Sequence, residues 1–168
     1  MHYSTDYSNW STSIPASTNC GSWTIYWYMD ASTNYEGIGA STGRYVSSSI
    51  SKINPSITAY PTNRNPTYNG SAQYLLQGGT ANVSGSFSYS TATNAGSYTG
   101  TWWFTPSDTT NYNSLSGTVA ASIAKAGGSA WATANSWTYD GNNHAMATNW
   151  GGYGTLYFIY GGTWYSSI

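Results

Sequence analysis

Residues 94–104 read NAGSYTGTWWF, and residues 19–29 read NCGSWTIYWYM. After the shared Asn-x-Gly-Ser, aromatic and aliphatic side chains recur at alternate positions in both stretches. Because side chains alternate between the two faces of a strand, this period of two predicts one β-strand from each stretch. The core-facing residues are predicted to be Trp23, Ile25, Trp27 and Met29 in the first strand and Tyr98, Gly100, Trp102 and Phe104 in the second.

Three further pairs of similar segments follow each other in the same order along the chain. Their near-constant separation predicts a tandem repeat of about 70–75 residues. The pairs are NY at 34–35 and 111–112, SISK at 49–52 and SIAK at 122–125, and TYNG at 67–70 and TYDG at 138–141.

The two ends of the chain also resemble each other, with WSTSI at 10–14 and WYSSI at 164–168. If these two end segments are the same part of the repeat, the chain divides into three parts. Residues 1–53 are predicted to hold the C-terminal part of one repeat, residues 57–126 a complete repeat, and residues 130–168 the N-terminal part of a further repeat.

The pattern predicts an all-β fold. Asn69-Gly70 and Asp140-Gly141 are turn signals, because these residue pairs readily reach the positive φ of tight turns. No long segment carries a helical stripe of apolar residues. Several short strands in each unit predict tandem β-sandwich repeats, and a β-solenoid is the competing fold.

Composition restricts the functions that the chain can have. Charged residues make up only 5% of it, while it contains 17 Tyr and 9 Trp. The four basic residues are scattered, so the clustered positive charge that nucleic acid requires is missing from the sequence. No apolar run reaches membrane-spanning length, and the single cysteine excludes an internal disulfide.

The repeat resembles the bacterial immunoglobulin-like (Ig-like) repeats of the MBG and YDG type. The matching segments are YSTDYSNWSTSIP at 3–15, TYNGSAQ at 67–73, NAGSYT at 94–99, NY at 111–112, ASIAKA at 121–126 and YDG at 139–141. The resemblance implies Ig-like modules in a stalk or adhesin at the cell surface or outside the cell. It implies neighbouring Ig-like repeats as partners, and no catalytic residues.

The first residues lack the basic and apolar segments of a secretory signal. Met1 also aligns with Phe87, which is predicted to lie inside a strand. We therefore expect the signal and the anchor to lie outside this chain. A rival hypothesis is that the C-terminal half-repeat of one chain completes the N-terminal half-repeat of another and builds a fibre. The two halves meeting within one chain is a third arrangement.

The sequence predicts neither a catalytic centre nor a metal or cofactor site. The five acidic residues do not recur as a pair, and two histidines with one cysteine are too few for a zinc site. Cys20 aligns with Ala95 and is interpreted as a small packed residue. Lys52 and Lys125 recur and are interpreted as solubilising residues at strand ends, with a lysine–Asn/Asp cross-link as the alternative.

The best candidates for binding are aromatic side chains on the face opposite the predicted core, namely Tyr26, Tyr28 and Trp103. Exposed Tyr and Trp stack on sugars or anchor a protein partner, and the alternative is that they cover the sheet. The sequence as a whole predicts a non-enzymatic spacer, with a glycan or a host-surface protein as candidate ligand. The alternatives are a carbohydrate-binding module, a decorative Ig-like domain of a phage structural protein, and a strand-complemented fibre subunit.

Overall fold

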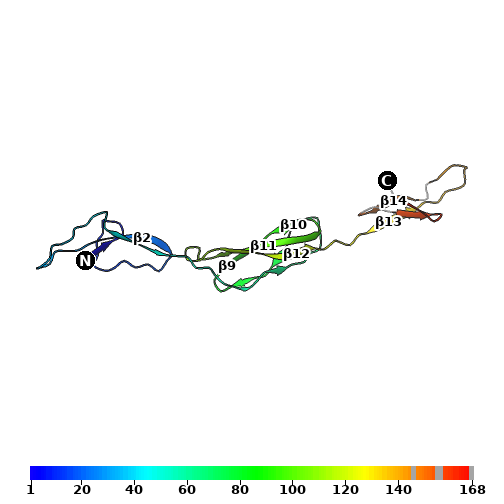
Figure 1. The fold of residues 1–168 in the computed structure, drawn as a ribbon. Coiled ribbons are helices and arrows are strands. Elements are labelled where there is room, and N and C mark those ends of the chain that lie inside the picture. The colour runs from blue at the N-terminus through cyan, green and yellow to red at the C-terminus, as the bar shows by residue number, and fades with distance from the viewer. Residues whose placement is uncertain (145–146, 154–156, 167–168) are drawn as a thin grey trace.

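The computed structural model describes residues 1–144, 147–153 and 157–166. Its elements are all strands, β1 to β16, and none of the described residues is helical, which confirms the all-β prediction. The strands gather into three regions that follow one another along the length of the molecule (Figure 1). Ser167 and Ile168, which were part of the comparison between the chain ends, lie outside the described residues.

The first region is a three-stranded antiparallel sheet, the N-terminal sheet. It consists of β1 (His2–Ser4), β2 (Gly21–Tyr28) and β3 (Tyr45–Ile50), and β2 lies in the centre. The predicted strand from residues 19–29 is therefore present as β2.

The middle region, residues 57–126, contains a second three-stranded antiparallel sheet in the order β9–β11–β12. These strands are Gly85–Tyr89, Gly96–Pro106 and Leu115–Ile123. Shorter strands form two-stranded pairs beside this sheet, β4 with β8, β5 with β7 and β6 with β10. Their bounds are β4 Ile57–Ala59, β5 Thr62–Asn63, β6 Gln73–Tyr74, β7 Leu76–Gln77, β8 Thr80–Ala81 and β10 Thr91–Ala92.

The two three-stranded sheets pair their strands in the same register. Gly21 lies opposite Ile50 in the N-terminal sheet, and Gly96 lies opposite Ile123 in the middle region. From these starting pairs, both ladders continue without a shift for at least five further residues. The similar sequences at 19–29 and 94–104 therefore occupy equivalent places in two similar sheets.

The hydrophobic core lies in the middle region, between the β9–β11–β12 sheet and residues 75–76. Along β11, buried residues alternate with exposed or half-buried ones, as the period of two predicts. An added Cβ on Gly100 would meet the Leu76 side chain at 2.9 Å, so the two layers are in close contact there. The buried apolar residues are Leu75, Leu76, Trp102, Phe104, Ala121 and Ile123.

The prediction of a core was wrong for the N-terminal sheet. Trp23, Ile25 and Trp27 are only half-buried there, and so is Met29. The cause is the absence, among residues 1–54, of a layer equivalent to residues 57–81 of the middle region. Ser4 is the one residue of 1–54 that is fully buried.

The third region contains β13 (Ala130–Ala134) paired with β14 (Ala147–Gly152), and β15 (Tyr157–Tyr160) paired with β16 (Thr163–Ser166). The two predicted turns are confirmed. Gly70 and Gly141 have φ of 82° and 77°, and in both turns the preceding Asn69 or Asp140 side chain accepts the N–H two residues on. Positive φ of this kind favours glycine.

Candidate functional site

Two of the three predicted binding residues, Tyr26 and Tyr28, lie under other aromatic rings. The Tyr26 ring centroid is 5.2 Å from that of Tyr7, in an edge-to-face contact. Tyr28 stacks on His2 at 4.5 Å and meets Trp10 edge to face at 4.8 Å. These geometries are favourable aromatic pairs, and they leave Tyr26 and Tyr28 half-buried. Residues 7–10 thus cover the face of β2 on which a ligand would stack.

The segment that covers these rings is held by Asp6. Its Oδ1 accepts hydrogen bonds from the Ser8 and Asn9 backbone N–H groups at 2.9 and 2.8 Å. The Asn9 side chain donates to Oδ2 at 2.6 Å, and the Ser4 hydroxyl donates to Oδ1 at 2.8 Å. These bonds hold the pKa of Asp6 well below its ordinary value, and the backbone hydrogen bond from Asn9 has the largest effect.

Trp103, the third predicted binding residue, is 45% exposed. It lies on β11 between Ser88 of β9 and Ser116 of β12, its cross-strand partners. Its neighbours in sequence, Trp102 and Phe104, point into the core. Trp103 therefore presents an aromatic ring on the outer face of the middle region, between small hydroxyl side chains.

Each of the two histidines contacts one aspartate, and Asp6, Glu36 and Asp108 belong to neither pair. His2 Nε2 is 2.6 Å from Asp30 Oδ2, and His144 Nε2 is 2.6 Å from Asp140 Oδ1. Within residues 1–144, 147–153 and 157–166, no group of three or more His, Cys, Asp or Glu side chains is placed to hold a metal ion. Nor does any helix in that part of the chain have the length and apolarity to cross a membrane.

The loop that joins β11 to β12 is built on Asp108. Its Oδ1 accepts the backbone N–H groups of Thr110 and Asn111, both at 3.1 Å, and its Oδ2 accepts the Asn111 side-chain amide at 2.8 Å. These bonds, above all those from Asn111, hold the pKa of Asp108 below its ordinary value, and the charge of Lys52 adds to the effect. We call residues 108–111 the junction loop.

The junction loop binds the end of the N-terminal sheet. The Cys20 N–H donates to Asn111 Oδ1 at 2.7 Å, and the Asn111 side-chain amide donates to Asn19 Oδ1 at 3.1 Å. Lys52 Nζ donates to the Thr109 carbonyl at 2.6 Å. The N-terminal sheet and the middle region are thus joined by side chains more than 50 residues apart in sequence.

The linker after β3 adds a second set of contacts to this junction. The Ile53 N–H donates to the Asn111 carbonyl at 3.0 Å, and the Asn113 N–H donates back to the Ile53 carbonyl at 3.0 Å. The Asn113 side chain also donates to Asn54 Oδ1 at 2.7 Å. The linker is therefore fixed as a short parallel bridge, Ile53 to Tyr112.

Sequence reasoning did not identify this junction. Cys20 is half-buried, as expected of a small packed residue, but its backbone N–H is also a junction donor. Lys52, interpreted as a solubilising residue, is exposed and also hydrogen-bonds the junction loop. The available signal was the spacing Asp-x-x-Asn, which occurs at 6–9, 108–111 and 140–143. At the first two places it forms the same set of carboxylate hydrogen bonds.

A cavity lies at the opposite end of the middle region. It has a volume of about 690 Å³. Its lining includes Asn94, Ala95 and Lys125, together with the linker residues 126–128 and Tyr153 of the third region. In the shared register of the two sheets, these residues occupy the places of Asn19, Cys20 and Lys52. The residues that hold the junction loop at one end of the middle region thus recur around a cavity at its other end.

Comparisons with known proteins identify no relative. No family model, no curated protein and no solved structure matches the chain.

Proposed function

We propose that the chain is a run of Ig-like β-sandwich modules that serves as a non-enzymatic spacer in a bacterial cell-surface or secreted protein. Three features support this proposal: the equal register of the two three-stranded sheets, the two-sided core of the middle region, and the order of regions along one direction (Figure 1). The modules act mechanically, by holding a distance.

The junction between residues 19–54 and residues 108–113 is the observation that carries the spacer function. A flexible tether needs no contacts between the regions that it joins. Here backbone and side-chain hydrogen bonds cross from Asn111 to Cys20, Asn19 and Ile53, and from Lys52 to Thr109. Such a junction restricts bending, which is what a spacer of fixed length requires.

The distance distribution across the junction tests this function. Spin labels at Ser47→Cys and Thr99→Cys, both exposed positions, are measured in a Cys20→Ala background, which keeps the Cys20 backbone donor. Labelled protein is diluted with unlabelled protein, so that only distances within one chain are recorded. We expect a narrow distribution, which Asn111→Ala broadens.

The matched control is Asn143→Ala, an exposed asparagine in the third region. It is expected to leave the distribution narrow. A broad distribution in the protein that retains Asn111 contradicts the spacer function, because the junction would then not restrain the two regions.

Carbohydrate binding is the second candidate function, and Trp103 is the observation in its favour. An exposed indole between Ser88 and Ser116 offers a stacking face with hydroxyl groups beside it. Tyr26 and Tyr28 contribute less to this candidate, because Tyr7 and Trp10 cover them.

A further inference from the structure

The face of the N-terminal sheet that corresponds to the core face of the middle region is uncovered. Val46 and Ile50 are 54% and 39% exposed, and their cross-strand partners place them on one face with Ile25. The corresponding residues of β12 are Val119, which packs against the core, and Ile123, which is 3% exposed. The same kind of apolar face is thus covered in one sheet and open in the other.

In the middle region, the covering layer comes from residues 57–81, and β13–β14 repeats a part of it. Asn63 pairs with Leu76, and 71 residues later Ala134 pairs with Ala147. The turns at Asn69–Ser71 and at Asp140–Asn142 have the same separation and the same side-chain hydrogen bond. The β13–β14 layer carries an exposed apolar side chain of its own, Trp131, at 59%.

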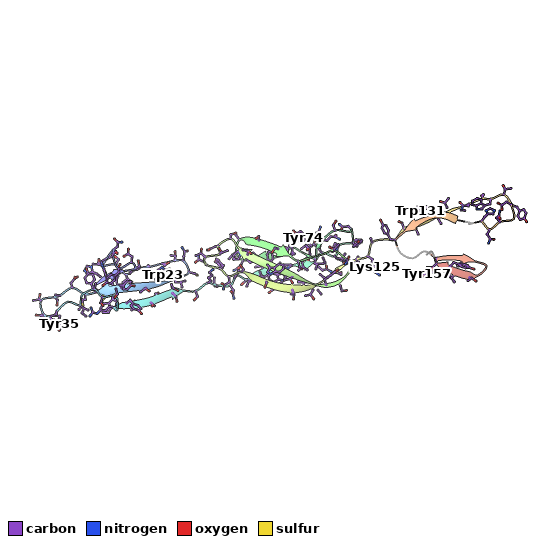
Figure 2. All side chains as sticks on the ribbon, turned by 90° about the horizontal axis from the view of Figure 1, so that it is seen from above. Trp23, Tyr35, Tyr74, Lys125, Trp131 and Tyr157 are labelled. Carbon is purple, nitrogen blue, oxygen red and sulfur yellow. The ribbon has the colours of Figure 1, made fainter. Side chains whose placement is uncertain are left out.

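These two complementary parts lie far apart in one molecule. Figure 2 shows Trp131 beyond one end of the middle region and Trp23, on β2, beyond the other. The accessible surface of the chain is 11942 Å², whereas a compact monomer of this mass has about 8,000 Å². The extended arrangement therefore leaves more surface exposed than a compact chain of the same mass does.

The cavity at Lys125 matches a loop at the far end of the N-terminal sheet. Residues 30–35 lie in the connection between β2 and β3, residues 29–44, as the junction loop lies in the connection between β11 and β12, residues 107–114. Both connections contain Asn-Tyr, at 34–35 and at 111–112. Tyr35 is exposed at the extremity of the molecule, opposite to Lys125 (Figure 2). A second copy that places its N-terminal sheet over β13–β14 brings this loop towards the cavity.

We propose that the chain assembles head to tail. The N-terminal sheet of one copy packs on the β13–β14 layer of the next copy, and residues 30–35 enter the cavity beside Asn94 and Lys125. The composite unit repeats the arrangement of the middle region and its junction. This inference rests on the modular organisation proposed above, but it requires a second copy, which the spacer function does not.

Two blocked variants of the full chain test the assembly. Val46→Asp places a charge on the open face of the N-terminal sheet, and Trp131→Asp places one on the β13–β14 layer; both positions are exposed, so each variant keeps its fold. By light scattering after size exclusion, we expect concentration-dependent oligomers of the unmodified chain and a monomer of 18.0 kDa for each variant.

Mixing the two variants provides the sharper measurement. Trp131→Asp retains an intact N-terminal sheet and Val46→Asp retains an intact β13–β14 layer, so the mixture is expected to form a dimer and nothing longer. Ile50→Asp is a second block of the same face. Ser47→Asp, on the opposite face of β3, is the matched control and is expected to assemble as the unmodified chain does.

The proposal is overturned if the unmodified chain is a monomer. It is also overturned if the mixture of the two variants stays monomeric, or if Ser47→Asp blocks assembly as fully as Val46→Asp does. These outcomes are separate from a failure of the spacer function. A monomer with a narrow distance distribution keeps the spacer and removes the assembly, whereas oligomers with a broad distribution do the reverse.

Discussion

Asn111 Oδ1 lies 2.7 Å from the backbone nitrogen of Cys20, across 91 positions of sequence. Asn111 is itself positioned by Asp108, which accepts both its backbone N–H and its side-chain amide. The carboxylate therefore acts on the junction through Asn111, and the protonation state of Asp108 decides how firmly that loop is held.

The first prediction concerns pH. The pKa of Asp108 is lowered in the folded protein, so its hydrogen bonds stabilise the junction above the unfolded pKa of about 3.9. That stabilisation is lost as the pH falls through the lowered pKa. The distribution of distances between spin labels at Ser47→Cys and Thr99→Cys is expected to broaden in samples frozen from pH well below 4. In Asp108→Asn, the width is expected not to depend on pH, and equal acid broadening in both proteins contradicts this role.

The second prediction contrasts two adjacent tryptophans in the core strand β11. Trp102 is 4% exposed and packs on Gly117, whose added Cβ would meet the indole at 2.6 Å. Trp102→Ala is expected to lower the free energy of unfolding by about 3–5 kcal/mol. Trp103→Ala, on the outer face, is expected to cost less than about 1 kcal/mol. Urea unfolding followed by circular dichroism measures both, and equal losses contradict the assignment of faces.

The third prediction tests carbohydrate binding on a glycan array. If the chain binds a sugar, Trp103→Ala is expected to abolish the signal, because the exposed indole is removed. Tyr28→Ala is expected to leave it nearly unchanged, because Tyr28 is stacked on His2 and covered by Trp10. Carbohydrate binding is contradicted if the unmodified protein gives no glycan-array signal. It is also contradicted at this site if the signal survives Trp103→Ala.

The fourth prediction concerns the segment over Tyr26 and Tyr28. Asp6→Ala removes the acceptor for the Ser8 and Asn9 backbone N–H groups. Hydrogen exchange of those two amides is expected to accelerate at least about tenfold, which corresponds to roughly 1.4 kcal/mol of local opening free energy. Asp140→Ala, at a turn in the third region, is the control and is expected to leave this exchange unchanged.

Local periodicity was enough to predict β2 and β11. The alternation from Tyr98 to Phe104 assigns the faces of β11 as the structure has them, with Trp102 inward and Trp103 outward. The turn prediction at Asn69-Gly70 was also confirmed, because a positive φ next to an Asn side chain is a local property. Both results depend on residues that are close in sequence.

Burial and the junction depend on distant residues. The sequence therefore mispredicted the burial of the N-terminal sheet and did not indicate the junction. Trp23 has the same alternating pattern as Tyr98, yet residues 1–54 form no second sheet over the face that holds Trp23. A period of two identifies an apolar face but not its covering layer. The contact between Asn111 and Cys20 also required the relative placement of two sheets, which no local pattern contains.

The path of the chain through the middle region has a mechanical consequence. The chain enters this region beside the junction loop, where Ile53 is bound, and leaves near Lys125 at the other end (Figure 2). Strands β11 and β12 are aligned along the molecule (Figure 1). The hydrogen bonds between antiparallel strands run perpendicular to the strands. A stretching force applied to the two ends therefore acts as shear on the β11–β12 pair, and it loads the inter-strand hydrogen bonds in parallel. These hydrogen bonds resist the force together and do not break one after another.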